Sequence, residues 1–356
     1  MINYEKALNI ITNKLNGISS TKELALLCSV KHICAKSIYA TTSLPTHPTA
    51  LKDGIAFLEN KNYEVSTGDI LKKGTMFVVP YEEDIQNPPN MYNIKKAEED
   101  IKKGELLIAK GELITAYGIT SLASQGVKKV EVFKKPKVSI LSIGDNLCPV
   151  QKKIKKGEVY NSNALTIATR VLEVGAKIAK VWQVKNNQIA IKEHLQELQK
   201  YSDFIITTGA MSRYDAMNKL IYDNEFQILF HKVEMAPASP TAFTIFENVP
   251  ILHLTGLPLS SLLGFELLGN HAIKIIKNEL HKKRGGLHVR NRKKFTCKGS
   301  YTNAVPGFFD GLSFKHSSSF KAGMLNILAK CNGYALIKNR TTIKKNETVE
   351  FFVFKN

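Results

Sequence analysis

From residue 136 to residue 283, apolar segments alternate with amphipathic ones, and this alternation limits the possible folds more than any other feature of the chain. It predicts an α/β domain whose mostly parallel sheet is covered by helices on both faces. In such sheets, ligands bind beyond the carboxyl ends of the strands. The expected strands are 138–143, 177–182, 204–208, 227–233, 242–246 and 251–254, and the expected helices are 163–175, 187–201, 214–223 and 259–280.

The segments on either side of this region predict further domains, since 356 residues exceed what one ordinary core holds. Apolar residues recur at three-to-four spacing over residues 1 to about 42, and Ser20-Thr21-Lys22-Glu23 resembles a capping box, so we expect helices there. Short alternating segments separated by turns predict a β module over 43–115. A helix is then expected at 116–126, a basic linker at 281–286, and short strands around a helical piece (321–329) over 287–356.

The composition is that of an ordinary globular protein, with 44% hydrophobic and 23% charged residues. No apolar run approaches the roughly 18 residues that a membrane span requires, and the N-terminus lacks the layout of a signal peptide. The five cysteines are scattered without a C-x-x-C pair, which argues against a disulfide framework and a zinc site. We therefore expect a cytoplasmic protein that does not bind a membrane.

The formal charge of +19 comes almost entirely from lysine, whereas proteins that read nucleic acids usually need arginine forks. We therefore expect no nucleic-acid partner. Two interpretations of the charge remain open: a lysine-rich solvated surface that reflects compositional bias, or a positive field that steers anionic ligands.

Several motifs occur in the order of one known family. Gly144-Asp145 closes the run 138–143 and is followed by Gly157-Glu158-Val159-Tyr160-Asn161-Ser162-Asn163. Before them lie the segments 93–105 and 121–126, and after them Gly323-Met324-Leu325 and 332–337. Together these segments resemble the molybdopterin molybdenumtransferase family, which comprises the MoeA and gephyrin E-domain proteins.

The resemblance implies a four-domain plan and an elongated homodimer. Residues 1–42 with 116–135 would form the helical dimerisation domain, and 43–115 an inserted, shortened β domain. Residues 136–283 would form the molybdopterin-binding α/β domain, and 287–356 a C-terminal β-barrel. A molybdopterin adenylyltransferase or a catalytic paralogue of the family is the implied protein partner.

The implied reaction uses adenylylated molybdopterin and molybdate: the nucleotide is removed and molybdate enters between the dithiolene sulfurs. Acidic side chains would hold Mg²⁺ against the phosphates, backbone N–H groups at helix starts would receive phosphate, and lysines would bind anions. By position in the motifs, the implied catalytic residues are Asp53, Asp100 and Asp145, and Asp145 is also an implied metal ligand. The second implied metal ligand is Asp215, which would serve in place of the motif's own acidic position at residue 217. The implied cofactor-binding residues are Thr208, Gly209, Ser212, Lys232, Pro240, Gly256 and Pro258.

The chain departs from the family motifs at the ligand. Asn146, Met76 and Met217 stand where the family has carboxylates, and Ala236 and Ser239 where it has lysines. These differences predict weak binding of metal and phosphate. Two functions remain open: a molybdenumtransferase, or a catalytically degenerate paralogue that binds pterin or a partner protein.

Asp53 and Asp100 also allow two interpretations, because Asp is favoured at turns and caps whether or not it has a catalytic role.

Overall fold

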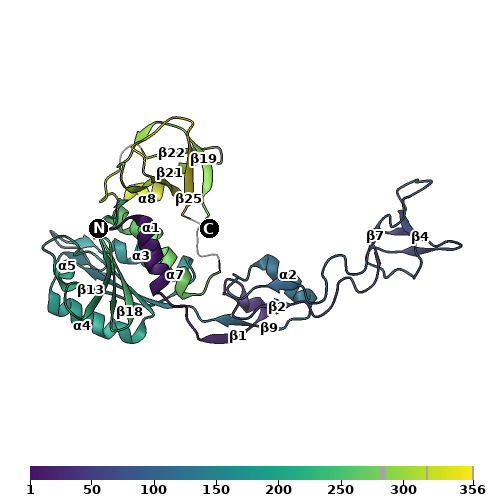
Figure 1. Ribbon diagram of the computed structural model, residues 1–356, viewed down its shortest axis with the longest axis horizontal. Helices are drawn as coiled ribbons and strands as arrows, with labels where there is room; N and C mark the ends of the chain where they lie inside the picture. Colours follow the sequence, from purple (N-terminus) through teal and green to yellow (C-terminus); the bar gives the residue numbers. More distant parts are fainter. Residues whose placement is uncertain (281–284, 318–319, 355–356) are drawn as a thin grey trace. The chain divides into compact units, whose positions relative to one another are not determined.

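The computed structural model describes residues 1–280, 285–317 and 320–354. The chain divides into two compact units, one formed by Met1–Ser20 with Phe133–Asn356 and the other by Thr21–Val132 (Figure 1). Residues 281–284 of the expected linker lie outside the described part of the chain. No helix in the described part is long and apolar enough to cross a membrane.

The larger unit contains a six-stranded sheet in the order β13-β10-β14-β18-β17-β15. The first four strands are parallel, β17 is antiparallel to β18, and β15 is antiparallel to β17. The expectation of a mostly parallel sheet is therefore confirmed. The strands are β10 (Lys137–Ile143), β13 (Lys177–Val184), β14 (Phe204–Thr208), β15 (Phe226–His231), β17 (Ala242–Phe246) and β18 (Val249–Leu254), with the short pair β11 (Leu147–Cys148) and β12 (Val159–Tyr160) beside them.

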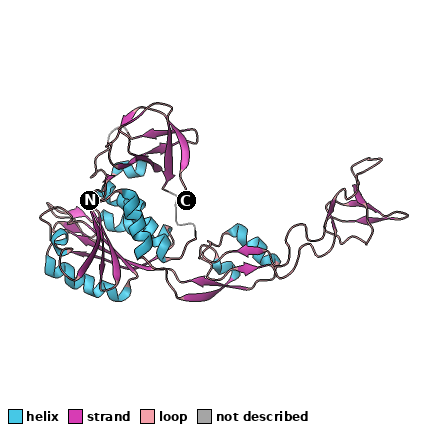
Figure 2. Cartoon of the chain, viewed as in Figure 1, coloured by secondary structure: helices cyan, strands magenta, loops and turns pink. Residues whose placement is uncertain are grey.

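Helices cover both faces of this sheet (Figure 2). Alternate residues of β10 enter different cores: Val138 and Ile140 belong to one cluster of buried side chains, and Leu141 and Ile143 to another. Strands buried on both faces need apolar residues throughout, which explains the runs seen in the sequence. The helices are α3 (Ser162–Glu173), α4 (Gln188–Leu198) with the 3₁₀ turn Gln199–Tyr201, α5 (Ala216–Leu220), α6 (Pro258–Gly264), the π-helical turn Phe265–Gly269 and α7 (Asn270–Ile276).

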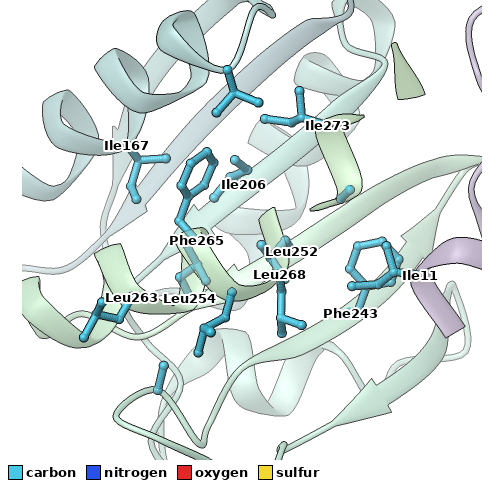
Figure 3. Close-up of a cluster of buried hydrophobic side chains, with 14 of the residues drawn as sticks. Ile11, Ile167, Ile206, Phe243, Leu252, Leu254, Leu263, Phe265, Leu268 and Ile273 are labelled. Atoms are coloured by element: carbon cyan, nitrogen blue, oxygen red, sulfur yellow. The ribbon is translucent and has the colours of Figure 1, made fainter. Parts of the chain in front are cut away.

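Helix α1 (Tyr4–Lys14) also packs on this domain. Ala7 and Ile11 are fully buried in the first cluster, part of which Figure 3 shows, and the Tyr4 hydroxyl donates to the carbonyl of Leu267 at 3.3 Å. The helix ends at Lys14, so the expectation of helix up to about residue 42 was wrong.

The expected second helix is replaced by a strand, β1 (Thr21–Ala25), which pairs with β9 (Lys129–Phe133). Thr21 does not cap a helix; its hydroxyl donates to the Glu131 carboxylate at 2.7 Å. Pairing with a distant strand therefore overrides the local helical spacing.

The C-terminal part forms a closed five-stranded barrel, as expected. Its strands follow the order β21-β22-β19-β25-β23, and β23 pairs back with β21. Phe314 and Phe351 are fully buried in its core. The elements are β19 (Leu287–Asn291), β21 (Thr302–Phe309), β22 (Ser313–His316), β23 (Gly333–Lys338), β25 (Thr348–Val353), the short pair β20 (Phe295–Thr296) and β24 (Thr342–Ile343), and α8 (Asn326–Lys330).

The smaller unit has two small cores, one around Cys34, Leu122 and Val132 and the other around Ala56 and Val78. Apart from helix α2 (Ala116–Ser124) and the 3₁₀ turn Leu26–Ser29, its regular elements are strands, so this region is less helical than expected. Besides β1 and β9, the strands are β2 (Ile38–Tyr39), β3 (Thr49–Ala50), β4 (Gly54–Phe57), β5 (Asn62–Val65), β6 (Phe77–Pro80), β7 (Ile94–Lys95) and β8 (Leu106–Ile108). The role of residues 1–42 and 116–135 in dimerisation stays a prediction.

Candidate functional site

A cavity of about 540 Å³ lies within the larger unit, between the carboxyl end of the parallel strands and the barrel. The α/β domain contributes the loops that follow β14 and β18 and the segment 235–240, and the barrel region contributes three residues. The lining residues are Ala210, Met211, Ser212, Asp215, Met235, Ala236, Pro237, Ala238, Ser239, Pro240, Thr255, Gly256, Leu257, Ser260, Lys298, Tyr301 and Ala322.

The loop after β14 requires glycine at position 209. Gly209 has φ +99°, and a Cβ atom there would lie 2.2 Å from the carbonyl oxygen of Ile143. The buried Thr208 hydroxyl donates to the carbonyl of Thr255 at 3.0 Å and lies 3.2 Å from the hydroxyl of Ser261. Thr208 and Gly209 are thus part of the support beneath the cavity, whereas the predicted Ser212 lines it.

Asn163, at the start of α3, fixes the loop after β18. Its side-chain amide donates to the carbonyl of Gly256 at 2.7 Å and lies 3.4 Å from the Thr208 hydroxyl. The predicted Gly256 lines the cavity, and Asn163 holds it there. The sequence motif 157–163 contains Asn163, but its spacing did not indicate this contact.

The structure connects Asp145 and Asp215 through Asn186, a residue that the sequence analysis missed. The Asn186 backbone N–H donates to Asp145 at 3.0 Å, and its side-chain amide donates to Asp215 at 3.0 Å. The other oxygen of Asp215 accepts the Ser212 N–H at 2.8 Å. Asn186 also supports the start of helix α5, because its side-chain oxygen accepts the N–H of Ala216 at 2.9 Å. Asp215 is therefore held firmly at the cavity wall.

These residues do not form a ready site for the Mg²⁺ that the resemblance implies. Among the described residues, no group of three or more His, Cys, Asp or Glu side chains could hold a metal ion. Both carboxylate oxygens of Asp215 already accept hydrogen bonds, and the neutral Asn146 follows Asp145. The described residues therefore do not fit a resident Mg²⁺.

The start of α6 is occupied by a carbonyl from the barrel region. The backbone N–H groups of Leu259 and Ser260 donate to the carbonyl oxygen of Ala322 at 3.0 and 3.3 Å. Pro258, at the first position of the helix, has no N–H group and does not line the cavity. The donors that an anion would need at this helix start are thus already used.

The remaining predicted residues lie in different places. Pro240 lines the cavity, but Lys232 is an exposed loop residue with φ +66° and does not. Asp53 and Asp100 belong to the smaller unit. The Thr67 N–H donates to Asp53 at 2.5 Å and holds the pKa of that carboxyl below its ordinary value. Asp100 pairs with the ammonium of Lys95 at 2.8 Å, and the catalytic role of both aspartates stays a prediction.

Both positions that lack the family's lysines, Ala236 and Ser239, line the cavity. Lys298 and Tyr301 also line it, and no sequence signal identified them, because they come from the barrel region more than fifty positions later. Lys298 carries the only positive charge among the described lining residues.

Two family models match the chain. One describes the MoeA N-terminal region (domains I and II) and matches residues 2–126, and the other describes a probable molybdopterin binding domain and matches residues 139–275. A molybdopterin molybdenumtransferase from Haemophilus influenzae is 24% identical over 303 residues, which cover 74% of this chain and 75% of that protein. One from Staphylococcus epidermidis is 28% identical over 231 residues, covering 60% of this chain and 54% of that protein.

Solved structures show the same fold. A molybdopterin biosynthesis MoeA protein from Pyrococcus horikoshii OT3 superposes with a TM-score of 0.84 at 20% identity, covering 99% of this chain and 100% of that one. A molybdenum cofactor biosynthesis protein from Pyrococcus furiosus gives 0.69 at 18% identity, covering 99% of each chain. The fold and cavity thus define a multidomain protein built around a molybdopterin-binding type of α/β domain. The chain belongs to the MoeA family, which confirms the resemblance seen in its motifs.

Proposed function

We propose that this protein acts in molybdenum cofactor biosynthesis as a molybdopterin molybdenumtransferase, inserting molybdate into adenylylated molybdopterin. The observation that supports this most directly is the cavity at the carboxyl end of the sheet. It lies in a chain whose residues 2–126 match the MoeA N-terminal region and whose residues 139–275 match a probable molybdopterin binding domain. The relatives' shared name favours the transferase over the degenerate paralogue.

The size and the apolar walls of the cavity suit a flat ring system. Its volume, about 540 Å³, falls in the range usual for small-molecule sites. Met211, Met235, Pro237 and Leu257 supply apolar walls for a ring system. Ser212 and Gly256 supply polar groups in the lining, which would orient the ring substituents of a pterin.

Asp215 is the acid best placed to act on such a ligand. It lines the cavity, and two N–H donors hold its carboxylate in place. We propose that it orients the substrate and accepts hydrogen bonds from the amino groups of the pterin. Any Mg²⁺ used in the reaction would then enter with the nucleotide phosphates.

We further propose that the protein is a homodimer in a reducing cytoplasm and receives its substrate from an adenylyltransferase. All five cysteines are free thiols, which fits a reducing compartment. The thin cores of the smaller unit fit an element that is stabilised by association. Sedimentation showing only monomer at micromolar concentration would refute the dimer.

The function is tested by reconstitution with purified protein, adenylylated molybdopterin and molybdate, with transfer of the product to a molybdenum-free apoenzyme as the readout. We expect activity in the wild type and a loss of about tenfold or more in Asp215→Asn, since hydrogen bonds to charged groups contribute about 1.5–3 kcal/mol. Asp223→Asn is the matched control, because Asp223 is exposed and lies outside the cavity. No insertion by the wild type would overturn the transferase and favour the degenerate paralogue.

A further inference from the structure

The charges that line the cavity are unusual for a site that takes anions. Asp215 contributes a negative charge, and the positions of the family's two lysines are occupied by Ala236 and Ser239. Among the described lining residues, the ammonium of Lys298 is the one cation. An oxyanion in this cavity therefore meets attraction from the barrel side rather than from the segment 235–240.

A buried side chain holds the loop that carries Lys298. Asn303, only 5% exposed, accepts the N–H of Lys298 at 3.0 Å and donates to the carbonyls of Lys298 and Tyr301 at 2.9 and 2.8 Å. Three hydrogen bonds from one side chain give the exposed loop a defined shape. The loop between β20 and β21 is thus a built structure rather than a loose connection.

Strand pairing brings this loop to the segment that lacks the lysines. The short strand β16 (Met235–Ala236) runs parallel to β21, with Ala236 opposite Asn303, and the Thr302 N–H donates to the carbonyl of Glu234 at 2.9 Å. The hydroxyls of Ser239 and Tyr301 both approach the thioether sulfur of Met1, at 3.8 and 3.7 Å. Because a thioether is a weak acceptor, both hydroxyls can turn to a stronger one.

The Lys298 ammonium is held in place by an aromatic ring. It lies 3.6 Å from the centroid of the Tyr301 ring, within cation–π range. Among the ion pairs of the described residues, none involves Lys298. Its charge is therefore positioned without being neutralised by a carboxylate.

We propose that Lys298, positioned by Tyr301, is the oxyanion-binding cation of this cavity and supplies the charge that Ala236 and Ser239 lack. The ligand is a tetrahedral oxyanion, either molybdate or a phosphate group, with the hydroxyls of Ser239 and Tyr301 as further donors. The identity of the oxyanion as a reactant rests on the proposed transferase function. The binding role of Lys298 rests on the pairing of β16 with β21, which brings its loop to the cavity.

The test is equilibrium binding of molybdate and, separately, of inorganic phosphate to the full chain at fixed ionic strength. We expect Lys298→Met to weaken binding of at least one anion about tenfold or more, and Lys298→Arg to retain most of it, because the charge is kept. Lys315→Met is the matched control: Lys315 is an exposed lysine of the same barrel, on β22, and its loss changes the net charge equally. The anion that binds more weakly to Lys298→Met than to the wild type shows whether the ligand of Lys298 is molybdate or a phosphate group.

A rescue experiment separates charge from folding. Ala236→Lys in the Lys298→Met background should restore binding of the affected anion, because it returns a cation to the same cavity. Equal binding by Lys298→Met and Lys315→Met would overturn the proposal, as would a wild type that binds neither anion.

The reconstitution assay is run in parallel on the same variants. If the wild type binds anion through Lys298 but inserts no molybdate, the transferase function fails and the assignment of Lys298 stands. If the wild type inserts molybdate and Lys298→Met matches Lys315→Met in both assays, the assignment of Lys298 alone fails.

Discussion

Replacing Gly209 by alanine should destabilise the α/β domain strongly and disturb the cavity above it. At φ +99°, a residue with a side chain is strained by about 1–2 kcal/mol. The new Cβ atom would also lie 2.2 Å from the Ile143 carbonyl oxygen, although real Cβ atoms essentially never come within 3.0 Å of another heavy atom. Displacing packed backbone costs about 1–3 kcal/mol more, so we expect a total loss of about 2–5 kcal/mol.

The chain offers both a matched control and a probe. Gly157 has φ +88° and no atom within 4 Å of its ideal Cβ position, so Gly157→Ala carries the strain without the clash. The single tryptophan, Trp182 on β13, reports unfolding of the same domain by fluorescence in a urea titration. The unfolding free energy falls by about 1–3 kcal/mol per molar urea, so the urea midpoint of Gly209→Ala should lie roughly 1 M below that of Gly157→Ala. Equal midpoints for the two variants would refute the steric argument.

Two further perturbations test buried charge. Glu266→Gln leaves the largely buried Arg170 without its buried counter-charge. We expect the unfolding free energy in the same titration to fall by about 3 kcal/mol, the low end for a buried ion pair, because Glu173 still contacts Arg170. A fall of less than about 1 kcal/mol would contradict this. Burial lowers the pKa of His253 from 6.5 to about 3, so between these values the unfolded state binds a proton that the folded state does not. The unfolding free energy should therefore fall by about 1.4 kcal/mol per pH unit as the pH drops from 6.5 toward 3. His253→Gln should remove this contribution, and an unchanged pH profile would show that the imidazole is already protonated in the folded state.

The fold was predictable where local pattern and tertiary environment agree. Strand β10 lies between two cores, so its side chains are apolar on both faces, and the sequence shows this directly. Residues 15–42 were mispredicted because β1 is stabilised by β9, more than a hundred positions later. A helical spacing of leucines does not reveal such a pairing.

The candidate site was predictable only from motifs that are contiguous in the chain. Ser212 and Gly256 lie in loops directly after strands, and both line the cavity. Asn186 acts through hydrogen bonds to residues about thirty to forty positions away, and Lys298 arrives through the pairing of β16 with β21. Neither contact produces a recognisable motif in the sequence, because both join residues that are far apart in the chain and come together only when it folds.

The position of α1 has a consequence for how the chain folds during synthesis. Tyr4 bonds to Leu267, which lies 263 positions later, and the core that buries Ile11 also includes Phe352. At about 5–20 residues per second, the apolar face of α1 leaves the ribosome more than about ten seconds before its partners are made. The α/β domain therefore cannot close in the order in which it is translated. Until its partners are made, the apolar residues of α1 stay unburied, and the core of this domain is completed only when α1 docks late.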